Sequence, residues 1–145
     1  MLREEEIVRD VLLSWAEGID RMKETWARYC AVNVVWWNSA RGPIHGVEDS
    51  FKVFDRMDTD PSLGFVAVRA PVVELLSRPG LVMVERSDDL VRADGSIIVS
   101  IPVTGVIAFE GETIVQWRDY ADDWMRNYRP DGESRNIVGP DHATT

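Results

Sequence analysis

Cysteine and histidine are scarce in this chain of 145 residues. Cys30 is the only cysteine and cannot form an internal disulfide, which favours a reducing compartment. The two histidines lie far from each other and from Cys30, so we expect neither a metal site nor histidine catalysis. No apolar run approaches the roughly 20 residues of a membrane span, and the acidic start of the chain differs from a signal peptide. We therefore expect a cytoplasmic protein without a membrane partner.

Positive charge is also in short supply. The chain has 16 lysines and arginines against 25 aspartates and glutamates, which gives a formal net charge of −9. Such an excess of carboxylates repels phosphate backbones and argues against a nucleic-acid partner. The sequence has no glycine-rich phosphate loop or dinucleotide loop either, so we expect no cofactor.

What remains is an ordinary globular composition, with 45% hydrophobic and 28% charged residues, and with six tryptophans. A chain of this length suits one domain. We place that domain at residues 1–128 and expect a loosely ordered tail at 129–145, which contains Pro, Gly, Asp and Ser.

The spacing of apolar residues changes from helical to strand-like along the chain. Pro71 and Pro102 interrupt two of the predicted strands and indicate bulges or edge positions. Helices followed by long strands with short hairpin turns are typical of the α+β class. We expect a cone-shaped, strongly curved mixed or antiparallel sheet that wraps around the N-terminal helices and encloses a pocket. The predicted helices are Leu2–Glu17, Asp20–Arg28 and Val47–Met57, the predicted strands are Ala31–Asn38, Phe65–Leu76, Leu81–Val91, Ile97–Phe109 and Thr113–Tyr120, and Ser39–Gly46 is a predicted loop.

Three of these strands carry an apolar face that ends in polar side chains, because side chains two apart in a strand share a face. A charged group that continues an apolar face is costly to bury alone and is tolerable only when it is paired. If the three polar ends converge, two carboxylates flank one guanidinium, with an amide beside them. The three faces are Val82, Val84, Arg86 and Asp88; Val115, Trp117 and Asp119; and Val32, Val34, Trp36 and Asn38.

A cluster of this kind has the groups that open an epoxide with water. One carboxyl delivers a proton to the leaving oxygen while the other takes a proton from the incoming water, provided that their pKa values differ. An arginine between them holds both carboxyls by bidentate hydrogen bonds, and an asparagine orients the water without titrating. The same residues also suit a buried structural ion cluster or solvated charges on an exposed sheet face, and the spacing alone leaves these interpretations open.

The second half of the chain contains three stretches whose order and separation form a pattern. They are Val84-Glu85-Arg86-Ser87-Asp88, Thr104-Gly105-Val106-Ile107-Ala108-Phe109-Glu110-Gly111 and Ile114-Val115-Gln116-Trp117-Arg118-Asp119-Tyr120. From Leu81 to Tyr120 the chain resembles the limonene-1,2-epoxide hydrolase family. The resemblance implies the curved-sheet cone that nuclear transport factor 2, ketosteroid isomerase and polyketide-cyclase-like proteins share, and it implies a homodimer.

The resemblance also implies roles for four residues. Asp88 would be the general acid that protonates the epoxide oxygen, and Asp119 the general base that activates water. Arg86 would bridge the two carboxyls, and Asn38 would position the water. The chain departs from the family at Trp36, where the family carries a tyrosine that helps to hold that water; an indole N–H donates a hydrogen bond but cannot accept one.

The expected function is therefore cofactor-independent hydrolysis of an apolar epoxide, with a cyclic skeleton favoured, to a vicinal diol in one step. Trp36, Trp117, Val84 and Val115 share faces with the charged groups, so we expect them to line the substrate pocket. Two alternatives stay open. One is an isomerase or cyclase of the ketosteroid isomerase or polyketide cyclase kind, including intramolecular epoxide opening, which the bulk of Trp36 favours. The other is a non-catalytic module that binds small molecules.

Overall fold

The computed structural model describes residues 1–121, so the predicted tail at 129–145 and the end of the predicted domain lie outside the described residues. The helices are α1 (Arg3–Trp15), α2 (Ile19–Tyr29) and α3 (Gly46–Thr59). Three glutamates occupy the first turn of α1, where carboxylates interact favourably with the positive end of the helix dipole. Among the described residues, no helix is long and apolar enough to cross a membrane.

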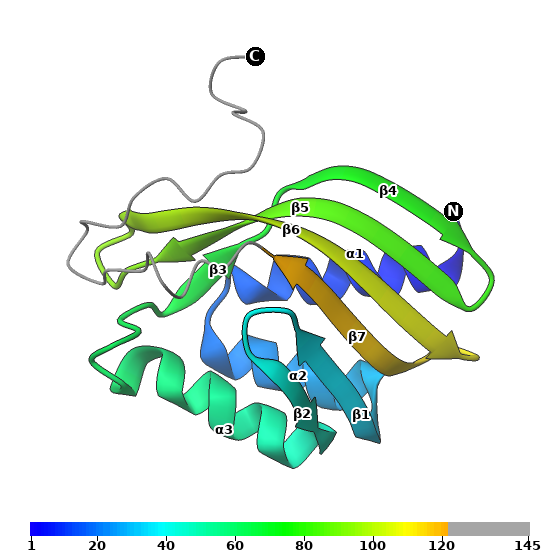
Figure 1. Ribbon diagram of the computed structural model, residues 1–145, viewed down its shortest axis with the longest axis horizontal. Coiled ribbons are helices and arrows are strands. Elements are labelled where there is room, and N and C mark those ends of the chain that lie inside the picture. Colours follow the sequence, from blue (N-terminus) through cyan, green and yellow to red (C-terminus); the bar gives the residue numbers. More distant parts are fainter. Residues whose placement is uncertain (122–145) are drawn as a thin grey trace.

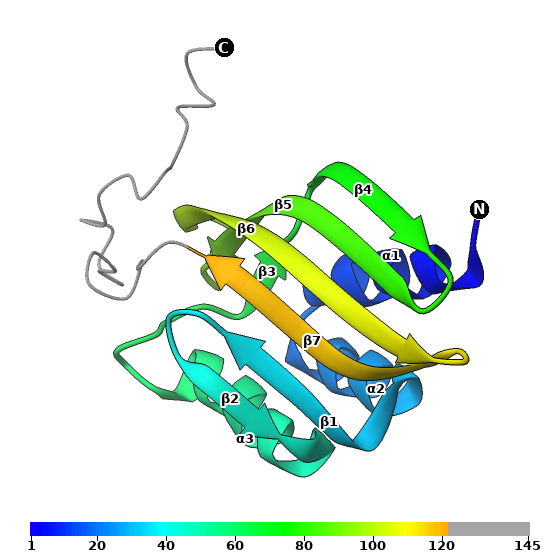
Figure 2. The ribbon, with the colours of Figure 1, turned by 45° about the vertical axis from the view of Figure 1, so that its right-hand side comes forward.

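The strands form one mixed sheet in the order β2-β1-β7-β6-β5-β3, and β4 pairs with β5 along the same edge as β3 (Figure 2). β1 and β7 run parallel, and the other pairs are antiparallel. The strands are β1 (Cys30–Asn38), β2 (Gly42–His45), β3 (Ala67–Arg69), β4 (Val72–Arg78), β5 (Leu81–Val91), β6 (Ile97–Glu110) and β7 (Thr113–Ala121).

The sheet is curved and does not close on itself, and the three helices lie on its concave side (Figure 1). Alternation along the long strands follows from this arrangement, because only the side chains of the concave face meet the helices. In β5, for example, Val82, Val84 and Arg86 are buried whereas Met83 and Glu85 are exposed. The predicted α+β cone is confirmed.

Two details of the predicted strands are wrong. The predicted loop at Ser39–Gly46 contains strand β2, which pairs with β1 through a tight hairpin. The predicted strand Phe65–Leu76 is two strands, because the chain breaks pairing at Ala70 and Pro71 between β3 and β4. Proline lacks the N–H that a continuous ladder requires, and here the carbonyl oxygen of Pro71 still accepts a hydrogen bond from the Ser87 N–H at 3.2 Å.

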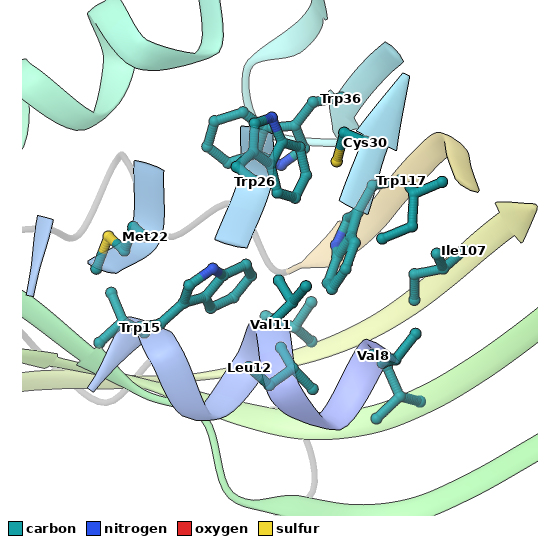
Figure 3. Close-up of a cluster of buried hydrophobic side chains, with 14 of the residues drawn as sticks. Val8, Val11, Leu12, Trp15, Met22, Trp26, Cys30, Trp36, Ile107 and Trp117 are labelled. Atoms are coloured by element: carbon teal, nitrogen blue, oxygen red, sulfur yellow. The ribbon is translucent and has the colours of Figure 1, made fainter. Parts of the chain in front are cut away.

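Aromatic side chains dominate the core between helices and sheet (Figure 3). Trp26 of α2 lies at its centre, with its ring centroid 5.3 Å from that of Trp36 and 5.5 Å from that of Trp117. The ring centroids of Trp15 of α1 and Trp117 are 5.5 Å apart, so rings from two helices and two strands form one network of contacts. Large rings in offset or edge contact fill this wide interior well.

Candidate active site

Arg86 of β5 is the centre of a charged cluster on the concave face, and its side chain is completely buried. Its Nε and Nη2 donate to Oδ1 and Oδ2 of Asp88 at 2.7 and 3.0 Å. Its Nη1 and Nη2 donate to Oδ1 and Oδ2 of Asp119 at 2.9 Å each. The Cζ atom lies 5.2 Å from the ring centroid of Trp15 and 6.0 Å from that of Trp117. Both carboxyls are therefore held bidentately by one guanidinium between aromatic rings.

The charge on Arg86 is maintained by these two partners. Burial on its own lowers the pKa of a guanidinium, but Asp119 and Asp88 outweigh the burial and raise the pKa of Arg86 above its ordinary value. The arginine is thus a permanent cation that links the carboxyl of β5 to the carboxyl of β7.

Gly105 of β6 makes this link possible. β6 lies between β5 and β7, and Gly105 pairs in register with Val84 on one side and Asp119 on the other. A Cβ atom at this position would lie 2.8 Å from Nη1 of Arg86 and 3.0 Å from Oδ1 of Asp119. The guanidinium and the carboxylate therefore meet across β6 at the one point of this strand that carries no side chain.

Asp119 receives a third donor, because Nε1 of Trp117 lies 2.9 Å from its Oδ1. Oδ1 thus accepts from Arg86 and from the indole, whereas Oδ2 accepts from Arg86 alone among residues 1–121. A carboxylate oxygen has two lone pairs, so Oδ2 keeps one acceptor position. Oδ2 is therefore the atom of Asp119 that can take a proton from a substrate or a water.

Asp88 differs from Asp119 in its surroundings. Its side chain is 17% exposed, compared with 5% for Asp119, and Arg86 is its donor on both oxygens. Burial raises the pKa of Asp88 above its ordinary value although Arg86 opposes the shift, and the charge of Asp119 adds to the rise. With both carboxyls ionised the cluster carries one net negative charge, and a proton on Asp88 makes it neutral.

Both carboxyls face a cavity of about 270 Å³ between the sheet and the helices. This volume lies near the lower end of the roughly 300–1,000 Å³ found for pockets that hold drug-sized ligands, which suits a small compact molecule. The walls are mostly apolar, with two carboxyls, one amide and two guanidinium groups among the lining side chains. The lining residues are Trp15, Met22, Trp36, Asn38, Ala40, Arg41, Val53, Phe54, Arg56, Met57, Leu63, Phe65, Val68, Asp88, Leu90, Ile101, Val103, Asp119 and Ala121.

Asn38 lies next to Asp119, because the two residues are register partners in the parallel pair of β1 and β7. Its Oδ1 accepts a hydrogen bond from the backbone N–H of Ala40 at 2.8 Å, which closes the turn into β2. The amide NH₂ group is thus the part of Asn38 that remains for a ligand. The turn itself is attached to β7, since the Ser39 N–H donates to the carbonyl oxygen of Asp119 at 2.9 Å.

The structure brings together five of the eight residues predicted for the site. Asp88, Asp119, Asn38 and Trp36 line the cavity, and Arg86 joins the two carboxyls behind it. Val84, Trp117 and Val115 are not among the lining residues.

The three residues lie elsewhere for two reasons. Val84 and Trp117 are fully buried under the helices, where packing leaves no space, and Trp117 acts on the site only through its bond to Asp119. Val115 lies at a bulge, because β7 shifts register between the pairs Ala108↔Gln116 and Phe109↔Ile114. The bulge puts Ile114 on the core side and ends the simple alternation from which Val115 was predicted.

Sequence reasoning missed Gly105, Arg41 and Arg56. Gly105 stands inside one of the motif stretches, and a glycine within a strand is a known sign of close approach, so this signal was available. Arg41 and Arg56 come from the β1–β2 turn and from α3, and nothing in their local sequence relates them to the strands of the charged cluster.

Nothing in the described part of the chain gathers three metal-ligating His, Cys, Asp or Glu side chains. Cys30 is buried, and burial raises the pKa of its thiol, so it packs as a small apolar group and is a poor nucleophile. The polar groups at the cavity are therefore two carboxyls with their bridging guanidinium, one amide, and the guanidinium groups of Arg41 and Arg56.

A family model described as the limonene-1,2-epoxide hydrolase catalytic domain matches residues 13–126. The chain belongs to this family. No curated protein matches the sequence significantly.

Solved structures share the fold at low sequence identity. An LEH-like epoxide hydrolase of M. tuberculosis is 22% identical, with 83% of each chain covered and a TM-score of 0.67. An NTF2-like protein of unknown function from Burkholderia pseudomallei K96243 is 16% identical, with 85% of this chain and 93% of that chain covered and a TM-score of 0.68. A putative SnoaL-like polyketide cyclase from Jannaschia sp. CCS1 is 13% identical, with 83% and 85% covered and a TM-score of 0.66. At these identities the likeness establishes the fold, on which several activities occur.

Proposed function

We propose that this protein hydrolyses an apolar cyclic epoxide to a vicinal diol in one step, by general acid and general base catalysis and without a cofactor. The observation that carries the proposal is that one nitrogen of Arg86 donates hydrogen bonds to both carboxyls. Nη2 of Arg86 donates to Oδ2 of Asp88 at 3.0 Å and to Oδ2 of Asp119 at 2.9 Å. The Oδ2 atoms of the two carboxyls are thus separated by no more than two hydrogen-bond lengths, and both carboxyls line the same mostly apolar cavity.

In the proposed reaction a water held by Asp119 and the Asn38 amide attacks one epoxide carbon. The water gives a proton to Oδ2 of Asp119 as its oxygen bonds to carbon. The carbon–oxygen bond of the epoxide breaks, and the released oxygen takes the proton of Asp88. Exchange of protons with solvent then returns Asp88 to its acid form and Asp119 to its base form. No bond forms between substrate and protein.

The assignment of acid and base follows from the surroundings of each carboxyl. Burial raises the pKa of Asp88, which favours the protonated form that an acid needs. Asp119 accepts three N–H donors, and its Oδ2 keeps one acceptor position that can receive the proton of a water. Positioned acid and base groups of this kind typically contribute about 10²–10⁴-fold each to a rate.

The direct test is turnover of cyclohexene oxide in ¹⁸O-labelled water. We expect a diol that carries one ¹⁸O atom from the first turnover onward, because the added oxygen comes from water alone. A first-turnover diol without label would show that the oxygen comes from a carboxylate of the protein and would contradict the one-step mechanism. Absence of any diol across a panel of apolar epoxides would reject the hydrolase.

Intramolecular epoxide opening is a second candidate, favoured by Trp36. This residue stands where the resemblance places a tyrosine, and its indole N–H is buried without a hydrogen-bond partner. A substrate hydroxyl that replaces water needs the same acid and base but no water-holding phenol. An epoxy alcohol would then give a cyclic ether without ¹⁸O, whereas hydrolysis gives a labelled triol.

We also propose that the protein acts in the cytoplasm. We further propose that it forms a homodimer in which a second copy of the chain covers the convex face of the sheet. The ring centroids of Trp37 and Tyr120 are 4.9 Å apart on this face, and Tyr120 is 48% exposed. Leu76 and Met83, paired in register, add exposed apolar surface on the same side. Such surface on a sheet face favours self-association. Sedimentation of the full chain would distinguish a dimer from a monomer.

A further inference from the structure

Within residues 1–121, one guanidinium at the rim of the cavity forms no ion pair. Arg41 follows Asn38 in the β1–β2 turn, lines the cavity and is exposed on its outer side. Its side chain makes no ion pair or hydrogen bond with any residue in the described range, 1–121. The other arginine of the lining, Arg56 of α3, is paired instead with Asp60 at 3.0 Å. One of the two rim cations is thus neutralised and the other is not.

The guanidinium of Arg41 contacts an aromatic wall of the cavity. Its Cζ lies 4.3 Å from the ring centroid of Trp36, so the guanidinium lies over the indole. A cation–π contact of this kind uses none of the lone-pair acceptors that an N–H group seeks, so the N–H donors of Arg41 remain for a ligand. The turn is held by the Arg41 N–H bond to the Asn38 carbonyl at 3.0 Å and by paired bonds between Ser39 Oγ and the backbone of Ala121.

We infer that Arg41 binds a carboxylate on the substrate, so that the preferred substrate of the proposed reaction is an epoxy acid. The reacting end of such a molecule would lie at Asp88 and Asp119, and its acid group would reach the rim at Arg41. This inference rests on the proposed function for the reaction, but the binding of the carboxylate is independent of turnover.

The electrostatics support a role in binding. Partial burial lowers the pKa of Arg41 to about 10 although the charge of Asp119 opposes the shift, so the group is still a cation at neutral pH. A partly desolvated cation that forms no ion pair within residues 1–121 gains from an anionic ligand, and a bidentate guanidinium–carboxylate pair is among the stronger hydrogen-bonded contacts.

The test compares two inert probes of equal shape, cyclohexanecarboxylate and cyclohexanecarboxamide, by titration calorimetry on the full chain. We expect the carboxylate to bind the wild type at least about tenfold more tightly than the amide. Arg41→Met, which keeps the length and the contact with Trp36, should abolish this preference. Arg56→Gln is the matched control and should retain it, because Arg56 already has a carboxylate partner.

Three results would overturn the inference: no preference in the wild type, a preference that survives in Arg41→Met, or an equal loss in Arg56→Gln. A parallel assay with 3,4-epoxycyclohexanecarboxylate and its amide separates this inference from the proposed function. Turnover of both epoxides without carboxylate preference rejects the inference and keeps the hydrolase. Carboxylate binding that depends on Arg41, without turnover of any epoxide, keeps the inference and rejects the hydrolase.

Discussion

The concave face of the sheet has two halves that start from the same strand pattern and end differently. In one half, Val82, Ile107 and Ile114 are fully buried against the helices. In the other half, Asp88, Asp119 and Ile101 of the same three strands line the cavity. Alternation of side chains puts both sets on one face. The two halves therefore differ in what lies in front of the face, which is closely packed core in one half and the cavity in the other.

We expect the largest effect on both stability and activity when the guanidinium that bridges the two carboxyls is removed. Arg86→Met leaves two buried carboxyls without their common partner, so we expect the free energy of unfolding to fall by about 3–5 kcal/mol and activity to vanish. Denaturant titration measures the first and diol formation the second. Arg118→Met, an arginine on the opposite face of β7, is the control and should cost far less.

Loss of one carboxyl should damage the reaction more than the fold. Asp88→Asn and Asp119→Asn keep shape and burial but remove the acid or the base, so we expect kcat to fall about 10²–10⁴-fold in each. Steady-state kinetics on an epoxide, with circular dichroism to verify folding, measures this. Asp89→Asn, one residue along β5, should retain activity. Full activity in either active-site variant would contradict the proposed roles.

The packing of the two halves can be compared by making the same Ile→Ala substitution once in each half. Ile107 and Ile101 lie on the same face of β6, but only Ile101 borders the cavity. Ile107→Ala opens a new void in a closed core, for which we expect a loss of about 2–5 kcal/mol of stability. Ile101→Ala extends an existing cavity and should cost less. Equal losses in thermal and denaturant unfolding would show that the two halves are packed alike.

We expect a smaller effect on stability and kcat from a methyl group at Gly105, where Arg86 and Asp119 meet across β6. In Gly105→Ala the new Cβ would lie within 3.0 Å of Arg86 and Asp119, so the pair must separate. We expect about 1–3 kcal/mol of destabilisation and a drop in kcat. Thr104→Ala, the exposed neighbour on β6, should change stability by less than about 0.5 kcal/mol. Unchanged kinetics in Gly105→Ala would show that the exact contact is dispensable.

The smallest effect is on the pH dependence of stability. Because the pKa of Asp88 is higher in the folded state than in the unfolded state, the folded state binds more protons between the two values. Stability from this group is therefore fully present at low pH and declines as pH rises through the folded-state pKa. Urea titrations across pH should show this decline in the wild type and not in Asp88→Asn. The acid step predicts that kcat declines in the same direction.

Much of the site could be predicted because it depends on short-range spacing. Arg86 and Asp88 are two apart in one strand, and Asp119 and Asn38 end two other apolar faces, so one rule places all four on the concave side. The rule failed at Val115, where a bulge in the pairing of β6 and β7 changes the face. It also could not separate Val84 from Asp88, since both share the face and only one borders the cavity.

The sequence by itself determined the α+β class, the long strands and the family, because periodicity and motif order are properties of neighbouring residues. Only the tertiary structure decided that β1 pairs with β7 in parallel, that Gly105 lets Arg86 reach Asp119, and that Arg41 stacks on Trp36 at the rim. These are contacts between residues far apart in the chain, and their geometry depends on sheet register and on how closely the helices approach. Positive charge is scarce in the sequence, yet one buried arginine joins the two carboxyls of the cavity and a second arginine, Arg41, lines that cavity without an ion pair in residues 1–121.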